Sequence, residues 1–376
     1  MPTLGELTAS TQRLALVGLA KNTGKTVALN ALLRELDQRD RRVGVTSVGR
    51  DGEERDALDA RIEKPRVELA AGSLVATTDG LLRASGLPNE PLEDAGVRTP
   101  LGRVLVARLR SAGAIEVAGP SAAADVRAVA DAMLAHGAEQ VLIDGAIDRR
   151  AASSPDVADG LLMATGAILD ADLEQVVART RDAVELVRLP PPCAEQPVRE
   201  RLRDLCAGAP GESMLANAEL AARPLPRRFV LTAEAEEVAG QLDASPDANW
   251  LLVAGALPER FLLALVHPLK RRRRELTVVV SDPTRVFLWK RGPAWFARQG
   301  VNLRALNATE LKALTVNPLA PRSHRFDSRE LRAALSRALP SVPVLDVLHR
   351  DYPALEAAEA STAGTVGGAG QTETFL

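Results

Sequence analysis

The residues best suited to chemistry lie near the start of the chain, in the segment Gly18-Leu-Ala-Lys-Asn-Thr-Gly-Lys-Thr26. An apolar run over 13–17 precedes it with the length of a buried parallel strand, and apolar residues at helical spacing follow it over 26–33. Gly-Lys-Thr between a strand and a helix is typical of a phosphate-binding loop, because backbone N–H groups converge there at a helix N-terminus. Lys25 would balance charge on the β- and γ-phosphates, and the Thr26 hydroxyl would bind Mg²⁺. An ordinary strand-to-helix turn with solvent-exposed lysines is the alternative.

The spacing of the two loop glycines differs from the usual phosphate-binding pattern. The common loop has four residues between its first glycine and Gly-Lys, whereas five residues separate Gly18 from Gly24. We predict that this longer loop still binds the phosphates of a nucleotide, because the strand before it and the helix after it are both present; the pattern does not distinguish ATP from GTP. The predicted nucleotide-binding residues are Gly18, Lys21, Asn22, Thr23, Gly24, Lys25 and Thr26.

Two aspartates that follow strand candidates are the predicted magnesium ligands. Asp144 ends the apolar run Val-Leu-Ile, and Asp51 lies in an acidic loop after the strand candidate 42–48. The carboxyl ends of parallel strands share one edge of a sheet, so both carboxylates would lie beside the bound phosphates. Glu53 and Glu54 are substitutes for Asp51. Acidic turns and apolar runs ending in Asp also occur without this chemistry, so a purely structural role is the alternative. The predicted catalytic residues are Lys25, Asp51 and Asp144, and the predicted metal ligands are Thr26, Asp51 and Asp144.

Strands and helices alternate from residue 13 to residue 189, which predicts an α/β fold with a mostly parallel, wound sheet of the P-loop NTPase class. A second, smaller α/β pattern follows a segment rich in Pro, Arg, Glu and Ala. The predicted organisation is a nucleotide-binding domain over 1–190, a linker over 191–226, a second α/β domain over 227–353 and a disordered tail over 354–376.

Turn signals also predict how some strands pair. Within the first domain we expect two strand pairs, 66–70 with 73–77 and 103–109 with 115–119. A strand over 228–231 is expected to open the second domain.

Composition argues against several classes of function. The chain of 376 residues has 47 basic and 49 acidic residues and a formal net charge of −2, so no overall positive field attracts nucleic acid or anionic lipid. The basic run 270–274 lies between a helix and a strand, where it suits a solvated helix end better than a nucleic-acid patch. Cys193 and Cys206 have no paired spacing, which argues against a disulfide scaffold and a zinc site. No apolar run approaches the roughly 20 residues of a membrane helix. No signal peptide precedes the first strand, so we expect a cytoplasmic protein.

The glycine-rich segment resembles loops of known nucleotide-binding families. Gly-x5-Gly-Lys-Thr is similar to the loop of dethiobiotin synthetases, and Lys-Asn-Thr-Gly-Lys-Thr resembles that of molybdopterin-guanine-dinucleotide accessory proteins. Both belong to the P-loop class that includes MinD and nitrogenase iron protein. Several members carry a second loop lysine that reaches a partner's nucleotide across a homodimer. The resemblance suggests that role for Lys21, although it lies four residues before Lys25 where the class has five. A solvated lysine is the alternative.

A longer series of motifs resembles one family over nearly the whole chain: Gly-Leu-Ala-Lys-Asn-Thr-Gly-Lys-Thr, Ser-Val-Gly-Arg-Asp-Gly-Glu, Val-Ala-Gly-Pro-Ser, Ile-Asp-Gly-Ala-Ile-Asp-Arg and Thr-Val-Asn-Pro-Leu-Ala-Pro. The family is the P-loop reactivase subunit associated with lysine 5,6-aminomutase, an adenosylcobalamin enzyme. The resemblance implies ATP-driven exchange of damaged cobalamin from the aminomutase, together with a MutS-like accessory subunit. It carries nucleotide and magnesium roles over to Lys25, Thr26, Asp51 and Asp144.

Three functions are therefore compatible with the sequence. The leading hypothesis is an ATPase that services a cobalamin-dependent aminomutase. The alternative is an enzyme of the dethiobiotin-synthetase kind, which uses ATP to activate a carboxylate. A third hypothesis is a nucleotide-dependent assembly module with negligible turnover. An amidotransferase is disfavoured, because neither cysteine follows a strand in a nucleophile turn.

Overall fold

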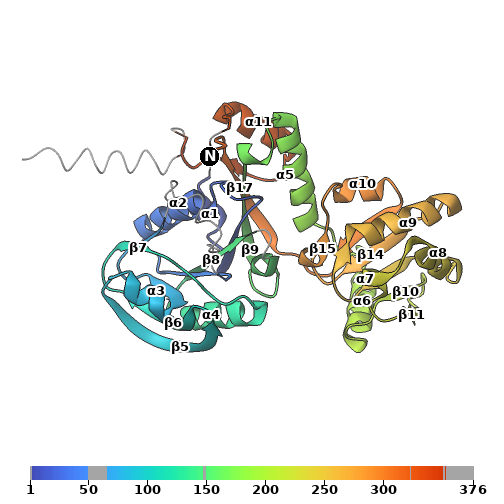
Figure 1. The fold of residues 1–376 in the computed structure, drawn as a ribbon, viewed down its shortest axis with the longest axis horizontal. Coiled ribbons are helices and arrows are strands. Elements are labelled where there is room, and N and C mark those ends of the chain that lie inside the picture. Colours follow the sequence, from blue (N-terminus) through green and yellow to red (C-terminus); the bar gives the residue numbers. More distant parts are fainter. Residues whose placement is uncertain (1, 50–65, 147–149, 322, 350–351, 353–376) are drawn as a thin grey trace, which may run out of the picture.

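The computed structural model (Figure 1) describes residues 2–49, 66–146, 150–321, 323–349 and 352. Its elements fall into a first unit around a large sheet and a second unit around a smaller sheet. The elements of the first unit are α1 (Leu4–Leu7), β1 (Arg13–Gly18), α2 (Lys25–Gln38), β2 (Val43–Ser47), β3 (Val67–Leu69), β4 (Leu74–Thr78), α3 (Asp79–Ala84), β5 (Asn89–Thr99), β6 (Gly102–Leu109), β7 (Gly113–Ile115), α4 (Ala123–Ala135), β8 (Gln140–Ala146), η2 (Arg150–Ser153), β9 (Gly160–Gly166), η3 (Ala167–Leu169), α5 (Leu173–Val187), β17 (Glu310–Asn317), α11 (Ser328–Ala338) and β18 (Val344–Leu345).

The large sheet has nine strands in the order β18-β17-β9-β1-β8-β2-β4-β6-β5. From β18 to β4 the neighbours pair in parallel, and β6 and β5 add an antiparallel edge. Alternate side chains of β1 enter two different cores, as the pleat of a strand requires. Leu14 and Leu16 pack with α1, α2 and α3, whereas Ala15 and Val17 pack with α4, α5 and α11. The expected α/β fold with a mostly parallel sheet is thus confirmed, and helices cover both faces of this sheet.

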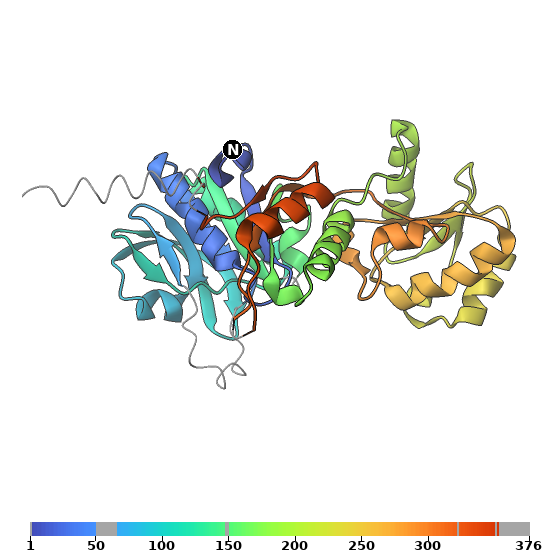
Figure 2. The same ribbon diagram turned by 90° about the horizontal axis from the view of Figure 1, so that it is seen from above.

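The second unit lies to one side of the first in both views (Figures 1 and 2). Its sheet has five strands in the order β11-β10-β12-β14-β16, of which the last three are parallel. The elements of this unit are α6 (Gln196–Gly208), β10 (Met214–Ala216), β11 (Ala222–Pro224), α7 (Phe229–Thr232), α8 (Ala235–Asp243), β12 (Trp250–Val253), β13 (Leu257–Pro258), α9 (Glu259–Arg272), β14 (Leu276–Val280), η4 (Pro283–Arg285), β15 (Val286–Phe287), α10 (Pro293–Ala297) and β16 (Val301–Ala305).

The chain returns from the second unit to the large sheet, which corrects the assignment of 227–353 to a second domain. β17 pairs with β9 and β18 pairs with β17, so both strands complete the first sheet. The predicted linker 191–226 is also structured, because β10 and β11 within it belong to the second sheet. The segment 228–231 is not a strand: most of it lies in α7. The predicted tail 354–376 lies outside the described residues.

Both predicted strand pairs are wrong. β3 pairs with β7, while β4 pairs with β2 on one side and with β6 on the other. β6 in turn pairs with β5, a long strand that the sequence did not indicate. Every residue of β4 is buried, as expected for an interior strand whose sheet is covered on both faces, and both of its hydrogen-bonding edges are taken by β2 and β6, which leaves no edge for β3. None of the helices in the described ranges has the length and apolar character that crossing a membrane requires.

Candidate functional site

The glycine-rich loop (Gly18–Thr26) connects the end of β1 to the start of α2 at the carboxyl edge of the sheet. Gly24 is the N-cap residue of α2 and has a φ of 83°, a left-handed conformation that favours glycine. Thr23 folds back inside the loop, where its hydroxyl donates to the carbonyl of Ala20 at 3.0 Å. A Cβ on Gly18 would lie 2.5 Å from that hydroxyl oxygen. The left-handed backbone at Gly24 and the lack of space for a Cβ at Gly18 therefore explain why both positions are glycine. The sequence pattern alone could not show this.

Lys25 and Asp144, which the sequence predicts to share a site, are in contact. Lys25 is the first residue of α2, and its Nζ lies 2.9 Å from Oδ1 of Asp144 and 3.0 Å from the carbonyl oxygen of Gly145, to which it donates. Asp144 lies on β8 beside Leu16 of β1, so the parallel register fixes its position below the loop. The side chains of Lys25 and Asp144 are 13% and 12% exposed, so this ion pair is largely shielded from water.

The other residues that the sequence predicts for the site lie either in the glycine-rich loop or outside the described residues. Thr26 follows Lys25 in the first turn of α2 and is half-buried, whereas Lys21 and Asn22 are exposed. Asp51, with Glu53 and Glu54, lies outside the described residues. The structure therefore places Asp144 and the whole loop at one edge of the sheet and does not test Asp51.

The carboxyl end of β2 lies next to Asp144 and contacts a further segment of the chain. Ser47 is the register partner of Asp144, and the N–H of Val48 donates to the Asp144 carbonyl at 2.8 Å. Gly49 exchanges backbone hydrogen bonds with the 119–120 segment. A Cβ on Gly119 would lie 2.0 Å from the carbonyl oxygen of Ser47, so only glycine permits this approach. The Val-Ala-Gly-Pro-Ser motif thus forms part of the same edge.

Asn317 is a site residue that sequence reasoning missed. It ends β17, and its side-chain amide donates to the carbonyl of Asn22 at 2.9 Å. Its Cβ lies 3.2 Å from the position that a Cβ on Gly24 would occupy, and its Oδ1 accepts from the N–H of Leu319. The sequence places Asn317 in the motif Thr-Val-Asn-Pro-Leu-Ala-Pro, but the assignment of this stretch to the second domain concealed its contact with the glycine-rich loop.

The donor set suits a phosphorylated ligand with magnesium. A helix N-terminus capped by glycine and carrying Lys25 favours bound anions, while the hydroxyl of Thr26 and the carboxylate of Asp144 are oxygen ligands of the kind Mg²⁺ takes. Within the described ranges no group of three or more His, Cys, Asp or Glu side chains could hold a metal ion by itself. Mg²⁺ at this edge would therefore need phosphate oxygens and water to complete its shell, as is usual for this ion.

No protein-family model and no curated protein matches this chain.

Proposed function

We propose that this protein is a P-loop ATPase that binds ATP and Mg²⁺ at the glycine-rich loop and acts as an accessory reactivase of a cobalamin-dependent aminomutase. The observation that carries the ATPase part is the contact of Lys25 with Asp144 beneath a glycine-capped helix N-terminus. The accessory role rests on the family resemblance of the sequence motifs, which extend from the loop to β17.

The residues of this chain would act on the nucleotide as follows. Backbone N–H groups of the glycine-rich loop and the start of α2 would hold the phosphates. Lys25 would exchange its contacts with Asp144 and Gly145 for phosphate oxygens, which releases the Asp144 carboxylate. Thr26 and Asp144 would then hold Mg²⁺. When bound, Mg²⁺ neutralises charge on the β- and γ-phosphates.

The path of the chain supports a role in servicing another protein. β17 leads directly from the second unit to the loop: it starts at the amino edge of the sheet, beside Gly160, and ends at the loop, and it is held at both of its ends. Just before it, the Thr309 hydroxyl donates to the Ser153 carbonyl at 2.8 Å, and at its end Asn317 holds Asn22. A change in the loop on nucleotide binding would therefore reach the second unit through one continuous strand.

The substitution Lys25→Ala tests nucleotide binding. We expect ATP·Mg²⁺ affinity to fall by at least about 100-fold, because two charge-assisted contacts to phosphate are lost, while the far-ultraviolet circular dichroism stays unchanged. Isothermal titration calorimetry measures the affinity. Lys270→Ala removes an exposed lysine from α9 of the second unit and is the control, for which binding should be retained. Unchanged affinity in Lys25→Ala would refute the site.

The accessory role needs a separate measurement. ATP turnover of the full chain is compared alone and with a purified cobalamin-dependent aminomutase, and we expect the aminomutase to stimulate it several-fold. Stimulation by a small carboxylate substrate instead would indicate a carboxylate-activating enzyme of the dethiobiotin-synthetase kind. ATP binding with no turnover under either condition would indicate an assembly module. In a homodimer that shares its sites, Lys21→Ala would lower turnover without weakening binding.

A further inference from the structure

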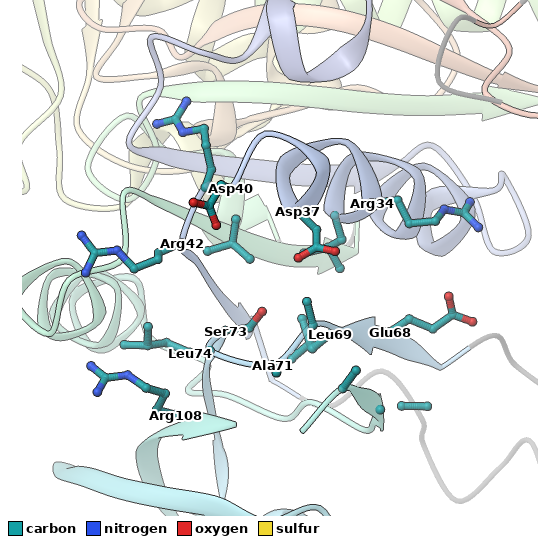
Figure 3. A pocket seen from close by; sticks show the side chains of 18 of the residues that line it. Arg34, Asp37, Asp40, Arg42, Glu68, Leu69, Ala71, Ser73, Leu74 and Arg108 are labelled. Atoms are coloured by element: carbon teal, nitrogen blue, oxygen red, sulfur yellow. The ribbon is translucent and has the colours of Figure 1, made fainter. Parts of the chain in front are cut away.

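A cavity lies at the opposite edge of the large sheet from the glycine-rich loop (Figure 3). It has a volume of about 760 Å³ and opens between the C-terminal end of α2 and the turn that joins β3 to β4. Val43 and Leu74, the first residues of β2 and β4, are among its lining residues. α2 thus spans the distance between the two places, with its N-terminus at one and its C-terminus at the other.

Two carboxylates on the α2 side of this cavity have unfavourable surroundings. Asp37 lies in the last turn of α2 and Asp40 follows the C-cap residue, so both are at the negative end of the helix dipole. Both are exposed, and within the described part of the chain neither side chain takes part in an ion pair or a hydrogen bond. A cation bound between these carboxylates and the opposite wall would relieve this repulsion.

The nearby arginines are occupied elsewhere. Arg39 pairs with Glu6, while Arg41 and Arg42 both reach Glu139, at 3.3 and 3.7 Å. On the other wall, Arg108 lies 3.6 Å from a carboxylate oxygen of Glu90 and also donates to a backbone carbonyl. Figure 3 shows Arg42 and Arg108 extending to one side of the cavity, away from the space below Asp37.

One charge of each sign lies at the other mouth of the cavity. Arg34 and Glu68 extend there, away from the space between Asp37 and Ser73 (Figure 3). Arg34 and Glu68 are of opposite sign, so together they add no net charge. The charges that face the middle of the cavity are therefore the negative charges of Asp37 and Asp40.

The opposite wall supplies a buried hydroxyl. Ser73 is 5% exposed, and both of its backbone polar groups are used: its N–H donates to Ala70 and its carbonyl accepts from Leu109. Its hydroxyl, in contrast, has no hydrogen-bond partner within the described ranges. In Figure 3 this hydroxyl points into the space that Asp37 and Asp40 face from the other side. The hydroxyl oxygen is not among the fully enclosed polar atoms without a partner, so it is accessible from the cavity and free to accept a hydrogen bond from a ligand there.

The rest of the lining is apolar enough to hold an aliphatic chain. Leu33, Leu69 and Leu74 line the cavity but are only 4%, 3% and 1% exposed, so the apolar surface that faces it comes from the exposed Ala71, Ala112 and Ala114. Methylene groups placed against them would be removed from water, which stabilises binding by about 0.8 kcal/mol for each CH₂ group that is fully buried.

We propose that this cavity binds an organic cation of the alkylammonium or polyamine class. An ammonium group lies between the carboxylates of Asp37 and Asp40, one of its N–H groups donates to the hydroxyl oxygen of Ser73, and the aliphatic stem lies against the exposed alanines. The proposal does not depend on nucleotide binding, because the cavity is lined by none of the residues of the glycine-rich loop.

Calorimetric titration of the full chain with spermidine tests the proposal, at fixed ionic strength and without nucleotide. We expect saturable binding that weakens at least about tenfold in the double variant Asp37→Asn/Asp40→Asn, which removes two charges from the site. Ser73→Ala should weaken binding by a smaller factor. Asp204→Asn removes an exposed carboxylate from α6 and is the charge control, for which affinity should stay unchanged.

Several outcomes would overturn the proposal. It fails if wild-type protein shows no saturable binding, or if the double variant binds as tightly as Asp204→Asn. Tetramethylammonium has no N–H group and should compete poorly with spermidine. Efficient displacement of spermidine by MgCl₂ at matched ionic strength would mean that the carboxylates hold a metal ion instead. Lys25→Ala should retain spermidine binding, so a failure of the nucleotide site and a failure of this site are distinguishable.

Discussion

In the two larger sheets of this protein, parallel strands lead into helices whose first residues carry opposite charge. In the first unit β1 leads into α2, whose N-terminus has a glycine cap and carries Lys25. In the second unit the helix that follows β12 is α9, whose first residue is Glu259. That carboxylate is buried and accepts hydrogen bonds from the backbone N–H groups of Trp289 and Lys290, at 2.6 and 3.0 Å. One helix start therefore already holds an anion of the protein, and the other is arranged to hold an anion from outside.

The aspartates at the strand ends show the same contrast. Asp282 follows β14, and its carboxylate accepts from the N–H of Thr284 at 2.9 Å and from the hydroxyl of Ser281. Asp282 is thereby the N-cap residue of η4. Asp144, at the end of β8, is instead in contact with the lysine of the glycine-rich loop. Similar strand-to-helix topology thus yields a structural turn in one unit and a candidate binding site in the other. The first residue of the helix and the partner of the aspartate make the difference.

The largest effect that this comparison predicts is on stability in the second unit. Glu259→Ala leaves the N–H groups of Trp289 and Lys290 without their acceptor, and we expect a loss of about 3 kcal/mol in the free energy of unfolding. Chemical denaturation measures it. ATP affinity should not change. Glu259→Gln keeps an acceptor oxygen and should lose clearly less. Equal losses in the two variants would mean that the hydrogen bonds do not stabilise this helix start.

A smaller effect is expected at the corresponding carboxylate of the first unit. Asp144→Asn should weaken the magnesium-dependent part of ATP binding by about tenfold, or roughly 1.4 kcal/mol, because a neutral amide is a poorer Mg²⁺ ligand than a carboxylate. Binding is measured by calorimetry over a series of Mg²⁺ concentrations. Asp282→Asn is the matched variant in the second unit and should leave this titration unchanged. An unaltered titration in Asp144→Asn would remove this residue from the site.

The smallest effect concerns the strand that joins the two units. Asn317→Ala removes one hydrogen bond to the glycine-rich loop, worth about 1 kcal/mol, and should loosen the loop without removing any charged group. We expect ATP affinity to change by less than about fivefold, with faster amide exchange in the loop. Thr309→Val serves as the control at the other end of β17. Amide exchange that is equally fast in both variants would show that the effect is not specific to the contact with Asn22.

Local sequence patterns predicted the parts of the site that are close together in the chain. The glycine-rich loop is a continuous segment, and Asp144 is recognisable as the end of an apolar strand. Asn317 was not predictable in the same way, because its place in the site depends on β17 crossing back to the first sheet. The partner of a strand is decided by which faces the rest of the chain covers, and that information is not local.

Pairing between neighbouring strands failed for a related reason. The short turn at Gly72 indicates a hairpin between β3 and β4, and the left-handed backbone there, with a φ of 87°, is indeed a turn. However, β4 is an interior strand of the sheet, and β3 leaves it to pair with β7. A turn signal fixes where the chain reverses but not whether the two flanking strands share hydrogen bonds.

The return of β17 to the first sheet has a consequence for how the protein is made. Because the second unit lies between α5 and β17 in the chain, a ribosome delivers all of it before the strand that pairs with β9 has emerged. Until then β9 is a sheet edge, with unpaired backbone groups that can recruit other chains. The amino-terminal unit, which usually folds first during translation, is here the one that is completed last.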